Sequence, residues 1–220
     1  MSSPVGPDDN VLILASGSPR RAEILGEVGV RIEIVPAVID EDTILSGAHD
    51  FANAVQRLAL VKAQSVAAYR PGRVVLGADT IVVLDGEILG KPGSPDRATE
   101  MLQRLNDRSH EVITGIAVIN SAGESHTDFV STSVRFRRLG DDKISNYVST
   151  GSPLDKAGGY GIQDSSFAPV ASYDGCYLNV VGLPMCVTSR LIEKAGLPRI
   201  DADVCRGHAG FDAASPRVGE

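Results

Sequence analysis

Short apolar runs and longer amphipathic stretches alternate along this chain. The apolar runs predict β-strands at residues 11–15, 31–36, 74–84, 110–120 and 125–138. The amphipathic stretches predict helices at residues 50–68, 94–105, 141–149 and 184–195, after a first helix that begins at Pro19. This alternation of strands and helices is typical of a mixed α/β fold.

Turn residues support the predicted order of elements. Asp85-Gly86 follows the third strand and predicts a β-hairpin. Gly196 predicts the end of the last helix. The glycine-rich segment 151–161 fits neither a helix nor a strand, so the sequence leaves its structure open.

The two ends of the chain differ in composition from the middle. Residues 1–9 are rich in Pro, Ser and Asp, and residues 201–220 combine several glycines with scattered charge. We expect both to be flexible tails around a single domain at residues 10–200. The N-terminus lacks the basic and apolar regions of a signal peptide, and no apolar run approaches the roughly 20 residues of a membrane helix. We therefore expect a cytoplasmic protein without membrane contact.

The charge balance limits the classes of partner. The 220-residue chain carries a formal net charge of −7, with 43% hydrophobic and 22% charged residues. An acidic chain argues against general nucleic-acid binding, which requires a basic surface. A locally basic pocket within such a chain predicts a small anionic ligand instead.

Cysteine and histidine spacing gives no metal-binding motif. The cysteines are Cys176, Cys186 and Cys205, and they contain no C-x-x-C pair, so neither a disulfide framework nor a zinc site is indicated. The histidines are His49, His110, His126 and His208, and we expect them on the surface or in loops. Any metal would then be held by oxygen ligands, which favours Mg²⁺ or Mn²⁺.

The turn between the first strand and the first helix has the sequence Ser16-Gly17-Ser18-Pro19-Arg20-Arg21. Ser18 is suited to the N-cap and Pro19 to the first helical position. Arg20 and Arg21 then lie in the first turn, where the helix dipole already contributes about half a positive charge. A phosphate bound to the backbone N–H groups would balance these charges. The alternative is a pair of solvated arginines.

Lys62 conflicts with its own predicted helix. The apolar stripe of residues 50–68 includes Phe51, Val55 and Leu58, and Lys62 follows Phe51 by close to three helical turns. A lysine in this stripe needs a counter-charge, or it must extend along the stripe to water. Both a functional lysine and a snorkelling lysine remain open.

Asp79 interrupts the apolar run of residues 74–84. Aspartate is unfavourable in strands and costly to bury unless it is paired or bound to metal. The preceding Gly77 and Ala78 would leave room for a ligand. Asp79 is therefore the strongest catalytic candidate, and a structural salt bridge is the alternative.

Three further features are weaker. Asp40-Glu41-Asp42 is either a metal-binding cluster or a solvated loop. Lys91 lies between Gly90 and Pro92 in a segment that the proline biases toward an extended backbone. The glycines of residues 155–163 could bring the backbone close to a ligand, although the segment matches no phosphate-binding motif. Several cations and acids thus stand where their charge is unfavourable without a partner. Together they favour an enzyme that acts on a phosphate chain with a divalent metal.

Six sequence blocks resemble the signature blocks of the Maf family. They are Leu14-Ala15-Ser16-Gly17-Ser18-Pro19-Arg20-Arg21, Gly77-Ala78-Asp79-Thr80, Gly90-Lys91-Pro92, Leu154-Asp155-Lys156-Ala157-Gly158, Tyr160-Gly161-Ile162-Gln163 and Val181-Gly182-Leu183-Pro184. The blocks occur in the family's order and span nearly all of residues 11–196. The six matches together are specific, whereas any one of them alone would not be.

This resemblance implies an inosine-triphosphate-pyrophosphatase-like fold, with an elongated mixed sheet flanked by helices and two lobes around a central cleft. It also implies a homodimer that hydrolyses nucleoside triphosphates to the monophosphate and pyrophosphate with a divalent cation. The implied catalytic residues are Asp79, Lys62 and Glu41, with Glu41 and Asp79 as metal ligands. The implied substrate-binding residues are Ser16, Arg20, Arg21, Thr80, Lys91 and Gln163.

The resemblance also bears on substrate choice and on alternatives. Arg20, Thr80 and Gln163 match the branch that prefers dTTP and UTP over 7-methyl-GTP, whereas Ser152 stands where many relatives have an acidic residue. An amide such as that of Gln163 can both donate to and accept from a pyrimidine edge. Because relatives are associated with arrest of division and septum formation, a non-catalytic nucleotide-binding regulator is the alternative. A phosphatase that releases orthophosphate is weaker, since no phosphorylatable nucleophile motif is present.

Overall fold

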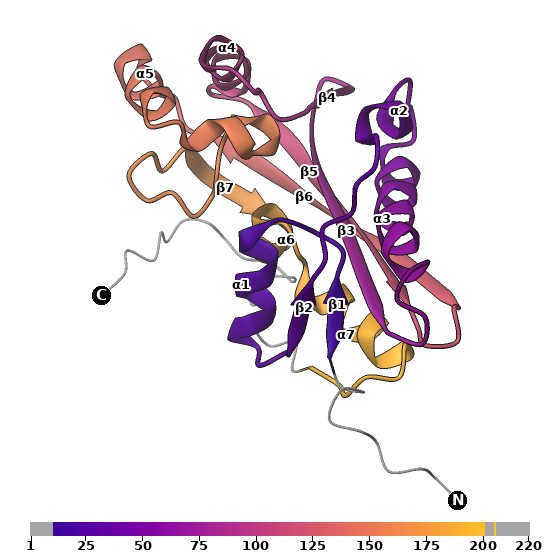
Figure 1. The fold of residues 1–220 in the computed structure, drawn as a ribbon. Helices are drawn as coiled ribbons and strands as arrows, with labels where there is room; N and C mark the ends of the chain where they lie inside the picture. Colours follow the sequence, from indigo (N-terminus) through magenta and orange to yellow (C-terminus); the bar gives the residue numbers. More distant parts are fainter. Residues whose placement is uncertain (1–10, 201–204, 206–220) are drawn as a thin grey trace, which may run out of the picture. The chain divides into compact units, whose positions relative to one another are not determined.

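The computed structural model describes residues 11–200 and Cys205, so the predicted tails at 1–9 and 201–220 lie outside the described residues, Cys205 apart. Seven strands form one sheet in the order β2-β1-β3-β5-β6-β7, and β4 pairs with β3 (Figure 1). The described residues divide into two compact units. Unit 1 comprises residues 11–79, 114–130 and 182–200 with Cys205, and unit 2 comprises residues 80–113 and 131–181.

Unit 1 is built around parallel strands. β1 (Leu12–Leu14) pairs in parallel with β2 (Ile32–Ile34) and with β3 (Val75–Leu84). The helices of this unit are α1 (Pro19–Glu27), α2 (Glu41–Leu45), α3 (Phe51–Ala67) and α7 (Met185–Lys194). α1 connects β1 to β2, which is the right length of connection for two parallel neighbours.

Unit 2 begins within β3, at Thr80. β3 turns back into β4 (Glu87–Leu89) through Asp85 and Gly86, whose φ angles of 53° and 79° are those of a two-residue hairpin. The other elements are α4 (Pro95–Leu105), α5 (Asp141–Ser149), β7 (Val170–Asp174), α6 (Tyr177–Val181) and two short 3₁₀ turns at Ser152–Asp155 and Ala157–Gly159. Two long strands, β5 (Ser109–Ile119) and β6 (Ser125–Phe136), contribute residues to both units.

The structure confirms the predicted mixed α/β fold and most of the predicted elements. Each of the predicted strands and helices is present within a few residues of its expected bounds. Three short elements, α2, β7 and α6, were not predicted, because segments of five residues are too short to show a clear periodicity. Within the described residues no helix is long and apolar enough to span a membrane.

α3 lies against β3 at unusually close range, and Gly77 makes this possible (Figure 1). A Cβ atom on Gly77 would lie 2.2 Å from the Ala59 carbonyl oxygen and 2.9 Å from the Ala63 nitrogen. On the side of α3 that faces β3, the small side chains of Ala59 and Ala63 belong to a core cluster of unit 1. The expectation that Gly77 leaves room for a ligand was therefore wrong, because the backbone of α3 fills that space.

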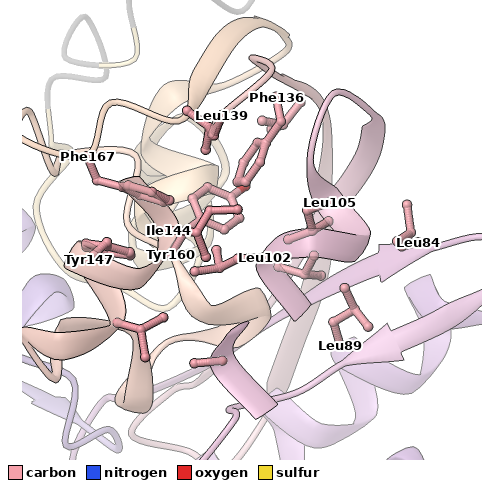
Figure 2. Packing of buried hydrophobic residues seen from close by; sticks show 14 of the residues in the cluster. Leu84, Leu89, Leu102, Leu105, Phe136, Leu139, Ile144, Tyr147, Tyr160 and Phe167 are labelled. Atoms are coloured by element: carbon pink, nitrogen blue, oxygen red, sulfur yellow. The ribbon is translucent and has the colours of Figure 1, made fainter. Parts of the chain in front are cut away.

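Aromatic side chains organise the core of unit 2 (Figure 2). Phe136 packs edge-to-face against Tyr160 and against His110, with ring centroids 4.7 Å and 5.1 Å apart. Tyr147 stacks on Phe167 at 3.8 Å between centroids. The contacts of His110 and Phe136 with Tyr160 join β5 and β6 to the glycine-rich segment that the sequence left open.

His110 is buried in this core, with 3% of its surface exposed, so the expectation of a surface or loop position was wrong for this histidine. Its Nε2 lies 2.7 Å from the Tyr160 hydroxyl, and its buried Nδ1 has no hydrogen-bond partner among the described residues. Burial lowers the pKa of His110 to about 4 and raises that of Tyr160. The imidazole is therefore neutral in the folded protein at neutral pH.

We predict that Gly77→Ala lowers the free energy of unfolding by about 3 kcal/mol, because the added methyl group must displace the backbone of α3. The measurement is urea unfolding at neutral pH. Gly26→Ala in α1 is the matched control, since a Cβ there meets nothing within 4 Å and alanine favours the helix by about 0.5–1 kcal/mol. Equal stability of the two variants would contradict the close packing.

We predict that unit 2 loses stability as the pH falls below 6.5. The folded pKa of His110, about 4, lies below the unfolded value of 6.5, so the unfolded chain binds the extra proton in this range. The expected loss is about 2 kcal/mol between pH 7.5 and pH 5. Tyrosine fluorescence during urea unfolding reports it, because all tyrosines except Tyr69 lie in unit 2.

His110→Gln is the control for this pH dependence, because glutamine is neutral throughout and can still hydrogen-bond to Tyr160. The loss between pH 7.5 and pH 5 should shrink by about 2 kcal/mol in this variant. An identical loss in both proteins would assign the acid sensitivity to other groups.

Candidate active site

Arg21 is fixed inside unit 1, with 8% of its surface exposed. Its Nε donates to the Gly182 carbonyl at 2.9 Å, and its Nη1 donates to Ser16 Oγ at 2.9 Å. Burial lowers the pKa of Arg21, and the carboxylates of Asp79 and Glu41 oppose this shift. The side chain thus joins the turn after β1 to the segment before α7, close to two acidic groups.

Ser16 is oriented by the same contacts. Its oxygen accepts the hydrogen bond from Arg21 and a second one from the Ser18 N–H at 3.3 Å. A hydroxyl has two acceptor lone pairs and one proton to donate. With two bonds accepted, the Ser16 hydroxyl still has its own proton to donate, as binding of an anion requires.

The start of α1 confirms part of the sequence prediction. α1 begins at Pro19 with Ser18 in the N-cap position, but the Ser18 side chain makes no capping hydrogen bond. Arg20 lies half-buried in the first turn, and its charge lowers the pKa of Arg21. The expected pair of arginines therefore divides into a buried Arg21 and a more accessible Arg20.

Lys62 lies at the centre of an ion-pair cluster. Its Nζ donates to Asp79 Oδ1 at 2.5 Å and lies 2.8 Å from Glu41 Oε1. With 6% of its surface exposed, Lys62 does not extend to water, so the snorkelling alternative is excluded. Three elements that are separate in sequence, α3, β3 and α2, meet through this one ammonium group.

Asp79 lies at the middle of β3, with 7% of its surface exposed. The ion pair that the sequence left as a structural alternative is present, because Lys62 binds one of its oxygens. A buried ion pair is weak evidence for a purely structural role, since apolar residues of similar size would often stabilise a core as well. The pair therefore does not decide between structure and catalysis by itself.

The acidic cluster Asp40-Glu41-Asp42 separates into different roles. Asp40 is the N-cap of α2 and accepts from the Thr43 N–H at 3.3 Å and from the Thr43 hydroxyl at 2.5 Å. These bonds lower the pKa of Asp40. Glu41, at the first position of α2, is the member of the cluster that reaches Lys62. The segment is thus a short helix that positions Glu41, so the alternative of a solvated loop was wrong.

Thr80, Lys91 and Gln163 belong to unit 2. Thr80 follows Asp79 directly on β3 and is half-buried, whereas Lys91 and Gln163 are exposed, in the loop after β4 and in a turn. The N–H of Gly158 donates to the carbonyl of Gly90 at 3.1 Å, so the glycine-rich segment supports the loop that carries Lys91.

One contact of the candidate site, the hydrogen bond from Arg21 to the carbonyl of Gly182, was not predicted from the sequence. No side-chain pattern could reveal it, because the contact is made by the backbone. The only available signal was the block Val181-Gly182-Leu183-Pro184.

The arrangement in unit 1 combines acids and bases in a partly dry environment. Asp79 and Glu41 can orient or deprotonate water, or bind a cation through oxygen. Lys62, Arg21 and Arg20 can neutralise negative charge that develops on a phosphate chain. Such a set is suited to displacement at phosphorus.

Known proteins resemble this chain over most of its length. A dTTP/UTP pyrophosphatase from Symbiobacterium thermophilum is 48% identical over 85% of this chain and 95% of the relative. Relatives of the same name from Anaeromyxobacter dehalogenans and Moorella thermoacetica are 47% and 46% identical, each over 95% of its length and over 85% and 84% of this chain.

Solved structures show a more distant similarity. A nucleoside-triphosphatase / dITP/XTP pyrophosphatase from Mycobacterium abscessus aligns at a TM-score of 0.40 and 18% identity, over 59% of this chain and 75% of that one. The Ham1 protein of Staphylococcus aureus aligns at a TM-score of 0.41 and 15% identity, over 57% of this chain and 71% of that one.

The family model described as Maf-like protein matches residues 11–195, which contain every residue of the candidate site. Together with relatives that are nearly half identical across their length, this match means that the chain belongs to the Maf family.

Proposed function

We propose that this protein hydrolyses nucleoside triphosphates to the nucleoside monophosphate and pyrophosphate. The observation that carries the proposal is the cluster in which the buried Lys62 ammonium group bridges Asp79 and Glu41 near Arg21. Relatives with 46–48% identity carry the name dTTP/UTP pyrophosphatase, which supports the same reaction here.

Asp79 is the group that orients and deprotonates the attacking water. One of its oxygens is held by Lys62, which fixes the carboxylate and leaves the second oxygen as the acceptor for a water proton. Attack on the α-phosphorus then releases pyrophosphate. Lys62 keeps the carboxylate in place and contributes positive charge beside the reacting phosphate.

The cations and Ser16 bind the triphosphate. Arg20, in the first turn of α1, contacts the phosphate chain together with the helix N–H groups and the Ser16 hydroxyl. Arg21 acts as a positioning residue, because two of its nitrogens already bind Ser16 and Gly182. Lys91 contributes a further charge to the leaving pyrophosphate.

The donor set fits a hard divalent cation such as Mg²⁺ or Mn²⁺. Asp79 and Glu41 supply carboxylate oxygens, the ligands that such cations prefer, and both carboxylates contact the Lys62 ammonium group. When bound, the cation would neutralise charge on the phosphate oxygens and on the leaving group. Asp79 and Glu41 are the residues that would hold it.

The substrate is dTTP or UTP in this proposal, including pyrimidine nucleotides with modified bases. Gln163 is exposed in its turn, where its amide can hydrogen-bond to a pyrimidine edge. Together with Arg20 and Thr80, it matches the residues of the branch that prefers dTTP and UTP. The names of the relatives agree with this preference. We also propose a cytoplasmic homodimer without a nucleic-acid partner.

A nucleotide-binding regulator without catalytic activity is the competing proposal. A pure binder gains nothing from two carboxylates beside a triphosphate, because they repel it unless a cation intervenes. Measured hydrolysis of a nucleoside triphosphate would favour the enzyme, and binding without hydrolysis would favour the regulator.

The direct test is product analysis with purified protein, Mg²⁺ or Mn²⁺, and equal amounts of dTTP, UTP, CTP, ATP and GTP. We expect pyrophosphate and the monophosphate, formed fastest from dTTP or UTP. Orthophosphate as the first product, or binding without turnover, would contradict the proposal.

In the same assay Asp79→Asn should lower kcat by roughly 10²–10⁴-fold, because the amide cannot accept the proton of water. Asp85→Asn is the control: Asp85 is exposed in the hairpin turn and pairs with Arg108, and asparagine tolerates its positive φ. Near-normal turnover of Asp79→Asn would exclude Asp79 as the base.

Arg21→Lys should lower kcat at least about tenfold although the charge is kept. Lysine cannot reproduce the two hydrogen bonds to Gly182 and Ser16, and misplacement of a binding group by about 1 Å can cost a factor of 10². Arg70→Lys, near the surface in an ion pair with Glu33, should leave kcat and KM unchanged. Equal kinetics of the two variants would show that Arg21 acts by charge alone.

A further inference from the structure

Asp164 directly follows Gln163 and lies at the junction of two turns in unit 2. Its N–H donates to the carbonyl of Gly161 at 3.2 Å, so residues 161–164 form a hydrogen-bonded turn with Gln163 as one of the two central residues. Its own carbonyl accepts from the N–H of Ala168 at 2.7 Å. The main chain on both sides of Asp164 is therefore held by hydrogen bonds.

The carboxylate of Asp164 closes the second turn. Its Oδ1 accepts from the Phe167 N–H at 3.1 Å and from the Ser166 hydroxyl at 2.7 Å. Aspartate side chains commonly fix turns by accepting from groups a few residues further along the chain. Burial opposes the shift, but these hydrogen bonds and the charge of Lys156 lower the pKa of Asp164. The side chain is therefore an ionised acceptor at neutral pH.

Aromatic residues on either side anchor the two turns in the core of unit 2 (Figure 2). Before the turns, Tyr160 packs edge-to-face against Phe136, with ring centroids 4.7 Å apart. At their far end, Phe167 stacks on Tyr147. Residues 161–166, between these anchors, are half-buried or exposed. Their orientation therefore depends on how the turns are closed rather than on core packing.

The backbone at both ends of the turns is constrained as well. Ala168 has a φ of 40°, in the left-handed region that residues with a Cβ atom rarely adopt. Such a conformation persists only where surrounding contacts hold it, and the hydrogen bond to the carbonyl of Asp164 is one of them. At the other end the stem of Lys156 lies beside Gly161, since a Cβ there would be 3.4 Å from Lys156 Cε.

We propose that Asp164 is a positioning residue that fixes the direction of Gln163 and thereby the preference for dTTP and UTP. This inference rests on the proposed function, because it takes the amide of Gln163 as the group that contacts the base. An amide offers a donor and an acceptor, so it distinguishes one base edge from another only when its orientation is fixed. Asp164 supplies this restraint through the turns and does not itself contact the nucleotide.

The test compares Asp164→Ala with Asp164→Asn in the full chain. Alanine removes the acceptor for Phe167 and Ser166, whereas the amide oxygen of asparagine keeps both bonds. We expect Asp164→Ala to lower the ratio of kcat/KM for UTP to that for CTP by about tenfold, mainly through a higher KM for UTP. Asp164→Asn should retain most of the ratio. An unchanged ratio in Asp164→Ala, or an equal loss in both variants, would overturn the proposal.

Asp142→Ala is the matched control, because Asp142 is exposed on α5 in the same unit. It should keep the wild-type ratio. Gln163→Ala then separates a restraint on Gln163 from a general effect on the protein. In that background Asp164→Ala should change the ratio by less than about twofold. A further loss of about tenfold in the double variant would show that Asp164 acts independently of Gln163 and would overturn the proposal.

Hydrogen exchange gives a readout that needs no hydrolysis. Asp164→Ala should speed exchange of the Phe167 amide by about tenfold, because its hydrogen bond is lost, and Asp142→Ala should not. Unchanged exchange would contradict the role of Asp164 in closing the turn. A wild-type protein that binds UTP without hydrolysing it would contradict the proposed function alone, and the same ratios measured as Kd values would then test Asp164.

Discussion

The close contact between α3 and β3 is the constraint on which the candidate site depends. Only glycine at position 77 allows the helix backbone to approach, since a Cβ atom would lie 2.2 Å from the Ala59 carbonyl oxygen. Lys62 follows Ala59 by about one helical turn, and Asp79 follows Gly77 by two residues on the same strand face. The distance of 2.5 Å between Lys62 Nζ and Asp79 Oδ1 thus follows from backbone packing.

Burial makes this ion pair informative. Removing an ammonium and a carboxylate from water costs several kcal/mol per ion, and their attraction restores that only with good geometry. A hydrophobic pair would fill the same space without this cost. The charged pair of Lys62 and Asp79, at a place where apolar residues would suffice, is therefore a reason to test these residues for chemistry.

The fold was largely predictable because its signals are local. Apolar runs, capping residues such as Asp50 and Ser94, and the Asp85-Gly86 turn each determine structure within a few residues. The residue types of the site were also predictable, since Lys62 and Asp79 each contradict the apolar pattern of their own element. Neither residue reveals its partner, because pairing depends on the register of α3 against β3.

The features that escaped prediction are those made by the backbone or by distant segments. Gly77 was interpreted as space for a ligand, because sequence shows that a side chain is missing but not what fills its place. The carbonyl of Gly182 lies far along the chain from Arg21 and contacts it through the main chain. The different contacts of Asp40 and Glu41 were also not predicted, because α2 is too short to show a periodicity and Lys62 lies in another element.

The two arginines of the first block illustrate how structure separates residues that a motif treats alike. Arg21 uses Nε and Nη1 on protein atoms and is almost fully buried, so moving it would disturb both Ser16 and the segment before α7. Arg20, one residue earlier, is half-buried at the helix N-terminus. Neighbouring residues in a helix point in directions about 100° apart, so one helical turn can offer both a fixed internal contact and a charge for a ligand. In the proposed function the Ser16 hydroxyl and the Arg20 guanidinium bind the phosphate while Arg21 holds Ser16 in place, so the two arginines have different tasks for a physical reason.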